Sequence, residues 1–256
     1  MWRLTAVLAM TSLTFAAQAS AQEWGTLKGR IVYKGDLTKP AALDITRDED
    51  VCGPHNLVDE SLIVNPSNRG LKNVVVWLSS KTSVPVHPKL SATPKPVRLD
   101  NKNCTFVPRI VRLRTDQILQ ATSSDPIAHN VAVYARRNNP FSEIIPKDSP
   151  LEKKFPREEL RPIRVDCSIH SWMRAYLIIT DHPYSAVTDK NGNFEIPNLP
   201  YGEWQFKFWH EKSEYLPQIQ NGNSTVELKS GMWKITIDKP ETNLPNLSVA
   251  EFKEEE

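Results

Sequence analysis

The chain has 256 residues, which is long enough for one or two domains with a real apolar core. Its 32 Lys and Arg residues nearly balance its 30 Asp and Glu residues, giving a formal net charge of +2. The basic residues form no stripe, so the sequence gives no reason to expect a nucleic-acid partner.

The first 21 residues read as a secretory signal peptide. A short basic start, MWR, precedes the apolar run LTAVLAMTSLTFAA, and ASA at 19–21 matches a small-x-small cleavage site before Gln22. An uncleaved membrane anchor is the alternative, but the apolar run is short for spanning a bilayer. We therefore expect a periplasmic or secreted protein with no membrane segment after cleavage.

The rest of the chain predicts an all-β protein. Short alternating or β-branched stretches recur about every 8–12 residues with turn residues between them, which is typical of β-sandwiches and barrels. One short helical turn within 149–160 is the main helix candidate, and 36–70 and 81–103 are expected to be extended surface loops. The expected strands lie within 25–35, 71–80, 105–124, 128–136, 174–181, 193–199, 203–211, 224–231 and 232–238.

The chain contains three cysteines, Cys52, Cys104 and Cys167. An odd count in an exported protein leaves one special thiol when the other two pair. Cys167 is the cysteine beside a histidine and a methionine, so Cys52–Cys104 is the economical disulfide, and either other pairing would use up Cys167. A Cys52–Cys104 disulfide would close a loop of about 50 residues, which stabilises the fold by about 4 kcal/mol in the chain-entropy model.

The segment CSIHSWM places Cys167, His170 and Met173 at regular spacing, between the expected strand RPIRVDC and the expected strand RAYLIIT. A mononuclear type 1 (blue) copper site uses two imidazoles, one thiolate and a weak axial thioether. The second imidazole has to come from upstream. His129 in AHNVAVYA, just before an alternating strand, is the one of six histidines in that position.

These motifs resemble the copper loop and upstream histidine motif of amicyanin/plastocyanin-like cupredoxins, and bacterial proteins of this shape are called methylamine-utilisation-protein-like. The resemblance covers roughly 104–182 and implies the ligands His129, Cys167, His170 and Met173. It also implies that Asn130 bonds toward Ser168, tying the two ligand loops together. Ile169, Thr115 and Ala121 depart from the family pattern, which affects the expected potential and rigidity of the site.

A second resemblance lies in SAVTDKNGNFEIPNLPYGEW. Asn191–Gly192 fits a tight hairpin turn with positive φ. The segment is similar to the carboxypeptidase regulatory-like, or transthyretin-like, β-sandwich, whose first half resembles GRIVYKG and NVVVWL. This implies a cupredoxin-type Greek-key sandwich inserted in, or packed on, a split sandwich. The expected units are 1–21 (signal peptide), 24–100 and 183–238 (split sandwich), 101–182 (cupredoxin) and 239–256 (acidic tail).

Other interpretations of the metal motif are zinc, which suits a thioether poorly, and a catalytic thiolate formed by Cys167 with a histidine. The oxyanion donors that such a nucleophile needs are not visible. His55, His87 and His182 lie in expected turns and should be solvated, while His210 should be a surface or structural residue. Trp172 is either an apolar contact beside the metal or ordinary packing, and Trp204, Trp209 and Trp233 are expected to fill cores or an inter-domain contact.

The sequence therefore predicts an exported one-electron carrier, not an enzyme, with one copper ion and a transient redox protein partner. One alternative is a non-catalytic module that binds a protein or carbohydrate and has a structural or vestigial copper site. Another is a copper-delivery or accessory protein. A multicopper oxidase is not expected, because H-x-H pairs and an H-C-H run are absent from the sequence. The oligomeric state is left open.

Overall fold

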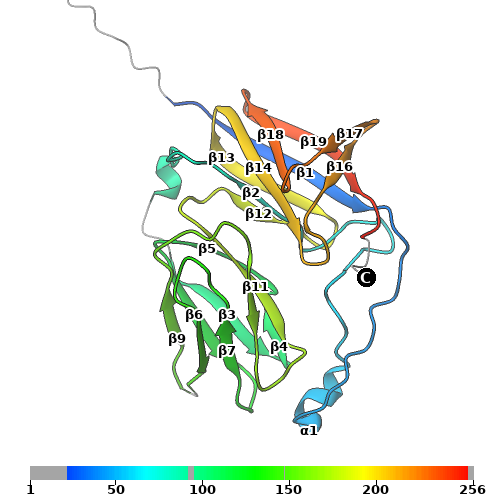
Figure 1. The fold of residues 1–256 in the computed structure, drawn as a ribbon, viewed down its shortest axis with the longest axis vertical. Coiled ribbons are helices and arrows are strands. Elements are labelled where there is room, and N and C mark those ends of the chain that lie inside the picture. Colours follow the sequence, from blue (N-terminus) through cyan, green and yellow to red (C-terminus); the bar gives the residue numbers. More distant parts are fainter. Residues whose placement is uncertain (1–21, 92–94, 147, 253–256) are drawn as a thin grey trace, which may run out of the picture.

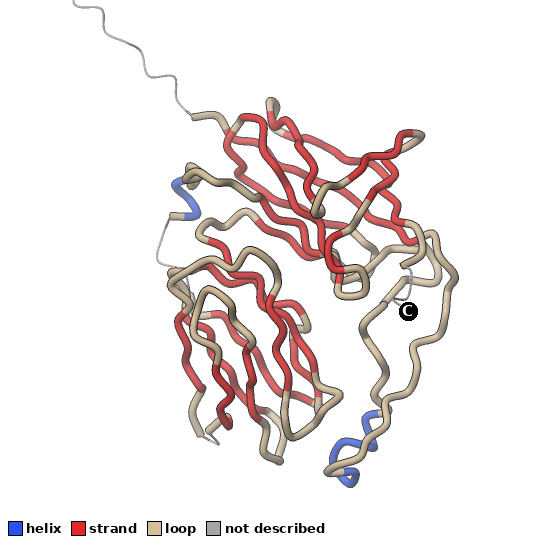
Figure 2. The backbone as a smooth tube through the Cα atoms, in the orientation of Figure 1, coloured by secondary structure: helices blue, strands red, loops and turns tan. Residues whose placement is uncertain are grey.

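The computed structural model describes residues 22–91, 95–146 and 148–252. The predicted signal peptide, 1–21, lies outside the described residues and stays a prediction. Within the described ranges, no helix is long and apolar enough to cross a membrane. The described chain consists of strands, loops and very short helices, so the all-β prediction is confirmed (Figures 1 and 2).

Two sheets from the two ends of the chain form what we call the outer sandwich (upper part of Figure 1). One sheet has the order β13-β1-β19-β16-β17, and the other has the order β12-β2-β14-β15 with β18 also paired to β14. The strands are β1 (Trp24–Tyr33), β2 (Val75–Leu78), β12 (Ser185–Val187), β13 (Asn193–Pro200), β14 (Gly202–His210), β15 (Glu214–Tyr215), β16 (Gln218–Asn221), β17 (Ser224–Glu227), β18 (Met232–Ile237) and β19 (Glu241–Val249).

The middle of the chain forms two further sheets, which we call the inner sandwich (lower part of Figure 1). Their orders are β5-β11-β10-β7-β8 and β4-β3-β6-β9. The strands are β3 (Val97–Lys102), β4 (Thr105–Val107), β5 (Ile110–Arg114), β6 (Ile118–Ser123), β7 (Asn130–Val133), β8 (Phe141–Ile144), β9 (Leu151–Lys154), β10 (Ile163–Asp166) and β11 (Arg174–Thr180).

Each sandwich has its own core. Alternation along β1 buries Leu27, Ile31 and Tyr33, which pack with Phe206 and Phe208 of β14 between the outer sheets. The inner core lies between strands of both inner sheets, and its buried members are Leu99, Phe106, Val111, Leu113, Leu119, Ala121, Val131, Val133, Ile145, Phe155, Ile163, Val165, Cys167, Met173, Ala175, Leu177 and Ile179.

Three expectations about the chain are corrected. Residues 241–249, assigned to the acidic tail 239–256, form β19, which pairs in parallel with β1 and buries Leu244 and Leu247. Residues 151–154 form β9 instead of a helical turn, because they pair with β6 while Phe155 anchors them in the core. The Asn191–Gly192 turn has the predicted positive φ at Gly192, but it does not join two strands of a hairpin. The strands on either side of it, β12 and β13, pair in different sheets.

The two long loops also contain structure. Residues 81–103 include η2 (Pro88–Leu90) and β3. Residues 36–63, which we call the arm, leave the outer sandwich and carry α1 (Glu49–Cys52) and η1 (Gly53–His55) at its tip. The arm runs out and back beside the inner sandwich (Figure 2), with its two limbs joined by the Ala42–Val58 bridge.

The two sandwiches meet through a small apolar cluster and one buried ion pair. Val75, Trp77 and Trp209 of the outer sandwich pack with Ile110 and Ile178 of the inner sandwich. Beside them, Arg109 donates to both carboxylate oxygens of Glu211 at 2.7 Å, and the two side chains are only 13% and 4% exposed. Trp209 therefore fills the inter-domain contact, as predicted.

Candidate metal centre

Three buried side chains from two loops meet at one end of the inner sandwich. His129 immediately precedes β7, Cys167 immediately follows β10, and His170 lies in the loop that leads into β11. Their ligand atoms all lie within 4.8 Å of one another, and each residue is at most 1% exposed. The antiparallel pairing of β7 with β10 brings the two loops together.

The three donor atoms form a triangle of the right size for a metal ion. The Nδ1 atoms of the histidines are 3.1 Å apart, and Cys167 Sγ lies 4.0 Å from that of His129 and 3.8 Å from that of His170. A centre about 2.0 Å from both nitrogens and about 2.3 Å from the sulfur fits in this triangle, and these lengths are typical for metal–imidazole and metal–thiolate bonds. The residues therefore fit a bound metal.

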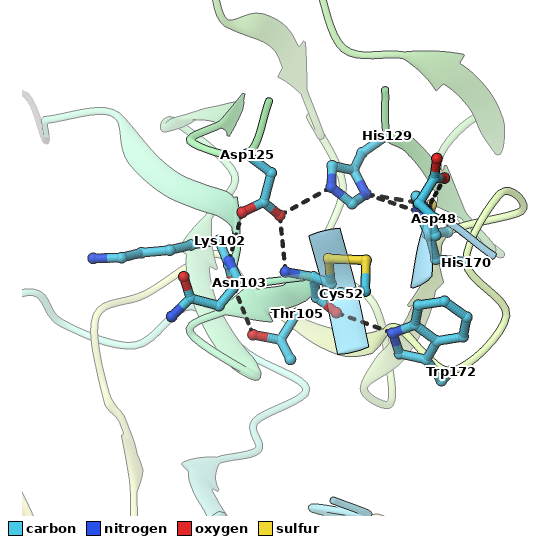
Figure 3. Close-up of a disulfide and its surroundings, with 11 residues drawn as sticks. Asp48, Cys52, Lys102, Asn103, Thr105, Asp125, His129, His170 and Trp172 are labelled. Carbon is cyan, nitrogen blue, oxygen red and sulfur yellow. Dashed lines mark hydrogen bonds and ion pairs between the residues drawn. A yellow bond between two sulfur atoms is a disulfide. The ribbon is translucent and has the colours of Figure 1, made fainter. Parts of the chain in front are cut away.

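A carboxylate holds the outer nitrogen of each histidine (Figure 3). His129 Nε2 lies 3.0 Å from Asp125 Oδ2, and His170 Nε2 lies 2.8 Å from Asp48 Oδ2. An ionised carboxylate only accepts hydrogen bonds, so each Nε2 must carry the proton. In neutral histidines both Nδ1 atoms are then lone-pair donors that face each other across the centre. A cation between them resolves this otherwise unfavourable contact.

The environment also keeps His129 neutral. Burial lowers the pKa of His129, and the neighbouring His170 lowers it further, although Asp125 acts in the opposite direction. Neutral imidazole is the form that binds metals, so the lowered pKa favours metal binding over protonation.

Asn130 joins the two ligand loops. Its Oδ1 accepts a hydrogen bond from the Ser168 backbone N–H at 2.6 Å, and its Nδ2 donates to the Ser168 hydroxyl and to Ser142. The same Oδ1 lies 3.3 Å from Cys167 Sγ. These bonds set the position of the segment that carries Cys167 relative to His129.

Met173 closes the ligand loop and belongs to the inner core beside Cys167. Its backbone N–H donates to the His170 carbonyl at 3.0 Å, and its own carbonyl accepts from the Cys167 N–H at 3.3 Å. The side chain is 1% exposed. Met173 is thus buried in the loop where the sequence predicts an axial thioether.

The predicted Cys52–Cys104 disulfide is confirmed, and Cys167 is the free cysteine. The disulfide connects the tip of the arm to the turn between β3 and β4. That turn has positive φ at Asn103 and Cys104, and both backbone N–H groups donate to Asp125, the residue that also holds His129. The disulfide is therefore part of the surroundings of the metal centre (Figure 3).

Trp172 lies between the ligand loop and the disulfide. Its ring centroid is 5.2 Å from that of His170, and its Nε1–H donates to the Cys104 carbonyl at 3.1 Å. Trp172 therefore contacts a ligand directly and also packs against the inner core.

His182 and His210 are also buried, and of these two His182 differs from its predicted surroundings. His182 is buried, not solvated. Its Nε2 lies 3.0 Å from the Leu78 carbonyl oxygen, and its ring stacks on Tyr184. His210 is a buried structural residue that stacks on Phe252. Neither belongs to the metal centre, whereas the expectation of solvation does hold for His55, which is exposed.

Sequence reasoning missed both carboxylates. Asp125 could have been found, because it precedes His129 by four residues in the same loop. Asp48 is 122 residues from His170 in the sequence, and no local pattern relates the two.

No known family model matches the chain, and no curated protein matches it significantly. Among solved structures, a copper-containing nitrite reductase from Thermus scotoductus matches with TM-score 0.31 and 15% identity, over 38% of this chain and 25% of its own. Amicyanin from Paracoccus versutus matches with TM-score 0.28 and 17% identity, over 41% of this chain and 96% of its own. A reduced Cu(I) form of an amicyanin mutant gives TM-score 0.30 and 12% identity, over 41% of this chain and 97% of its own.

Proposed function

We propose that this protein is an exported one-electron carrier with a single type 1 copper ion held by His129, Cys167 and His170, with Met173 as the weak axial ligand. The observation that supports this most is the triangle of two Nδ1 atoms and one Sγ. Two imidazoles and one thiolate, with a thioether nearby, form the donor set that favours copper in a trigonal site.

Burial distinguishes this proposal from cysteine catalysis. Cys167 is 1% exposed and His170 is fully buried, so a substrate has no direct approach to the thiol. An electron needs no such approach, since it passes between a donor and an acceptor that touch only the surface. The same burial argues against a hydrolytic zinc site, which keeps one position open to water.

Each residue of the site has a distinct task in this proposal. The bound copper would supply the chemistry by alternating between Cu(I) and Cu(II). Asp125 and Asp48 hold the imidazoles in one tautomer and orientation, and Asn130 fixes the cysteine loop. A site held this firmly changes little between oxidation states, which keeps the reorganisation small.

The cellular setting follows from the same proposal. The disulfide suits an oxidising compartment, and residues 1–21 have the pattern of an export signal, so we propose a periplasmic or secreted location. The partner would be another redox protein that docks transiently, because a carrier must also leave it.

A redox titration tests the carrier proposal. The mature chain loaded with Cu(II) should accept one electron per molecule from a chemical reductant. It should return the electron to an oxidant and repeat the cycle without losing copper. The control is Cys167→Ser, which keeps the size of the side chain but removes the thiolate. If the wild-type protein binds copper but does not cycle, the proposal fails and the alternative of a binding module with a vestigial site is favoured.

A further inference from the structure

The tip of the arm lies against the metal centre. The arm starts in the outer sandwich, and its limbs are joined by hydrogen bonds from the Leu43 N–H to the Leu57 carbonyl and from the Asp59 N–H to the Ala41 carbonyl, both within 2.9 Å. At the tip, Cys52 of α1 is bound covalently to Cys104 of the inner sandwich. A segment of the outer sandwich is therefore fixed beside ligands that belong to the inner sandwich.

Asp48 is the arm residue that reaches a ligand. Its backbone has φ of 49°, in the left-handed region, and its carbonyl accepts the N–H groups of Val51 and Cys52. The side chain makes no capping bond to α1. It points instead to His170, whose Nε2 lies 2.8 Å away and whose ring is fully buried beneath it. The outer edge of His170 is thus covered by a carboxylate, not by solvent.

We propose that Asp48 is a positioning residue of the metal centre, brought to His170 by the arm and kept there by the Cys52–Cys104 disulfide. Its carboxylate fixes the proton of His170 on Nε2 and turns Nδ1 toward Cys167 and His129. Its negative charge makes the imidazole a stronger electron donor and so favours Cu(II) over Cu(I). The inference rests on the proposed copper site, but its first consequence concerns the metal-free protein.

The disulfide links the two carboxylate–histidine pairs. Cys52 follows Asp48 in the arm, and the Cys104 N–H donates to Asp125, the carboxylate of His129. The disulfide therefore links Asp48, which holds His170, to Asp125, which holds His129 (Figure 3). Breaking the disulfide should release Asp48 without removing any metal ligand.

The tautomer of His170 in the metal-free protein is the first test, measured from ¹⁵N chemical shifts of the imidazole. In the wild-type protein His170 should be protonated on Nε2 alone. In Asp48→Ala it should become a mixture of tautomers, and the Cys52→Ser/Cys104→Ser variant should change in the same direction. Asp50→Asn, two residues further along in α1 and exposed, changes the charge equally and should leave His170 as in the wild-type protein.

Copper affinity and reduction potential are the second test. Losing an outer carboxylate partner typically weakens metal binding 10- to 100-fold, so Asp48→Ala should bind Cu(II) roughly 10- to 100-fold more weakly. Asp48→Asn, which keeps an acceptor but loses the charge, should raise the reduction potential while retaining most of the affinity. Asp50→Asn should change neither quantity.

The outcomes separate this inference from the carrier proposal. An unchanged His170 tautomer in Asp48→Ala overturns the positioning role, whatever the copper chemistry. An unchanged His170 tautomer in Cys52→Ser/Cys104→Ser overturns the role of the disulfide in keeping Asp48 beside His170. A changed tautomer in a protein that fails to cycle electrons supports the positioning role and counts only against the carrier.

Discussion

Burial affects the histidines of this protein in different ways. His129, His170, His182 and His210 are all buried, and the first three have a hydrogen-bond partner on Nε2. The Nε2 of His210 has none within the described residues. Burial lowers the pKa of His210 to about 3, although the backbone of Lys72 acts in the opposite direction. The positive charges of Arg109 and Lys212 lower this pKa further.

His210 should therefore make stability depend on pH. In the folded state it stays neutral down to about pH 3, whereas in the unfolded state it binds a proton below about pH 6.5. The unfolded state is thus favoured as the pH falls between these values. We expect the titration of His210 to lower the unfolding free energy by roughly 3 kcal/mol between about pH 6.5 and about pH 4.

Urea unfolding of the metal-free protein over this pH range measures the effect. The variant His210→Gln cannot titrate, so its unfolding free energy should fall less steeply with acidification than that of the wild-type protein. His55→Gln, at an exposed position, should keep the wild-type slope. If the unfolding free energies of His210→Gln and the wild-type protein fall equally steeply with acidification, His210 is not the source of the pH dependence.

At the residue scale, spacing along the chain determined what could be foreseen. Cys167, His170 and Met173 lie within one loop, and His129 lies just before a strand, so local sequence was enough to group them. Asp48 could not be foreseen, because its place beside His170 depends on how the arm docks.

At the scale of elements, the turn after β12 shows how a short motif positions a sheet. Asp189 accepts hydrogen bonds from the backbone N–H groups of Asn191 and Asn193 at 2.8 Å, and Gly192 has φ of 79°. A Cβ added to Gly192 would lie 2.1 Å from the Ile31 carbonyl oxygen of β1. The glycine is needed both for its backbone conformation and for the close approach of the turn to β1.

The variant Gly192→Ala should therefore destabilise the protein by more than a positive φ alone costs. Gly222→Ala is the matched control, because Gly222 has φ of 60° but nothing within 4 Å of an added Cβ. We expect Gly222→Ala to lower the unfolding free energy by about 1 kcal/mol, and Gly192→Ala to lower it by roughly 1–3 kcal/mol more, because backbone atoms must move. Equal losses in urea unfolding would show that the contact with β1 does not matter.

Alternation predicted most of the strands, since each such strand has one face toward a core. The strands that lie outside the expected ranges are β3, β8, β9, β12, β15, β16 and β19. The short β9 has little apolar pattern and is held by pairing with β6. β19 joins β1 from near the end of the chain, a pairing that no local pattern indicates. The course of the arm was also unpredictable, apart from the single restraint given by the Cys52–Cys104 pairing.

At the scale of the whole molecule, the metal centre combines parts of both sandwiches. The ligands and Asp125 come from the inner sandwich, whereas Asp48 comes from a loop of the outer sandwich. The Arg109–Glu211 pair and the cluster around Trp209 hold the two sandwiches together. The outer sandwich is therefore more than an appended domain, because it completes the surroundings of His170.

The optical absorption spectrum of the copper-loaded protein tests the central claim most directly. Coordination of Cu(II) by the Cys167 thiolate should give an intense blue or green thiolate-to-copper band with one copper ion per chain. The band should be absent from Cys167→Ser loaded with copper in the same way. A colourless copper-loaded wild-type protein, or a band that persists in Cys167→Ser, would contradict the assignment of the metal centre.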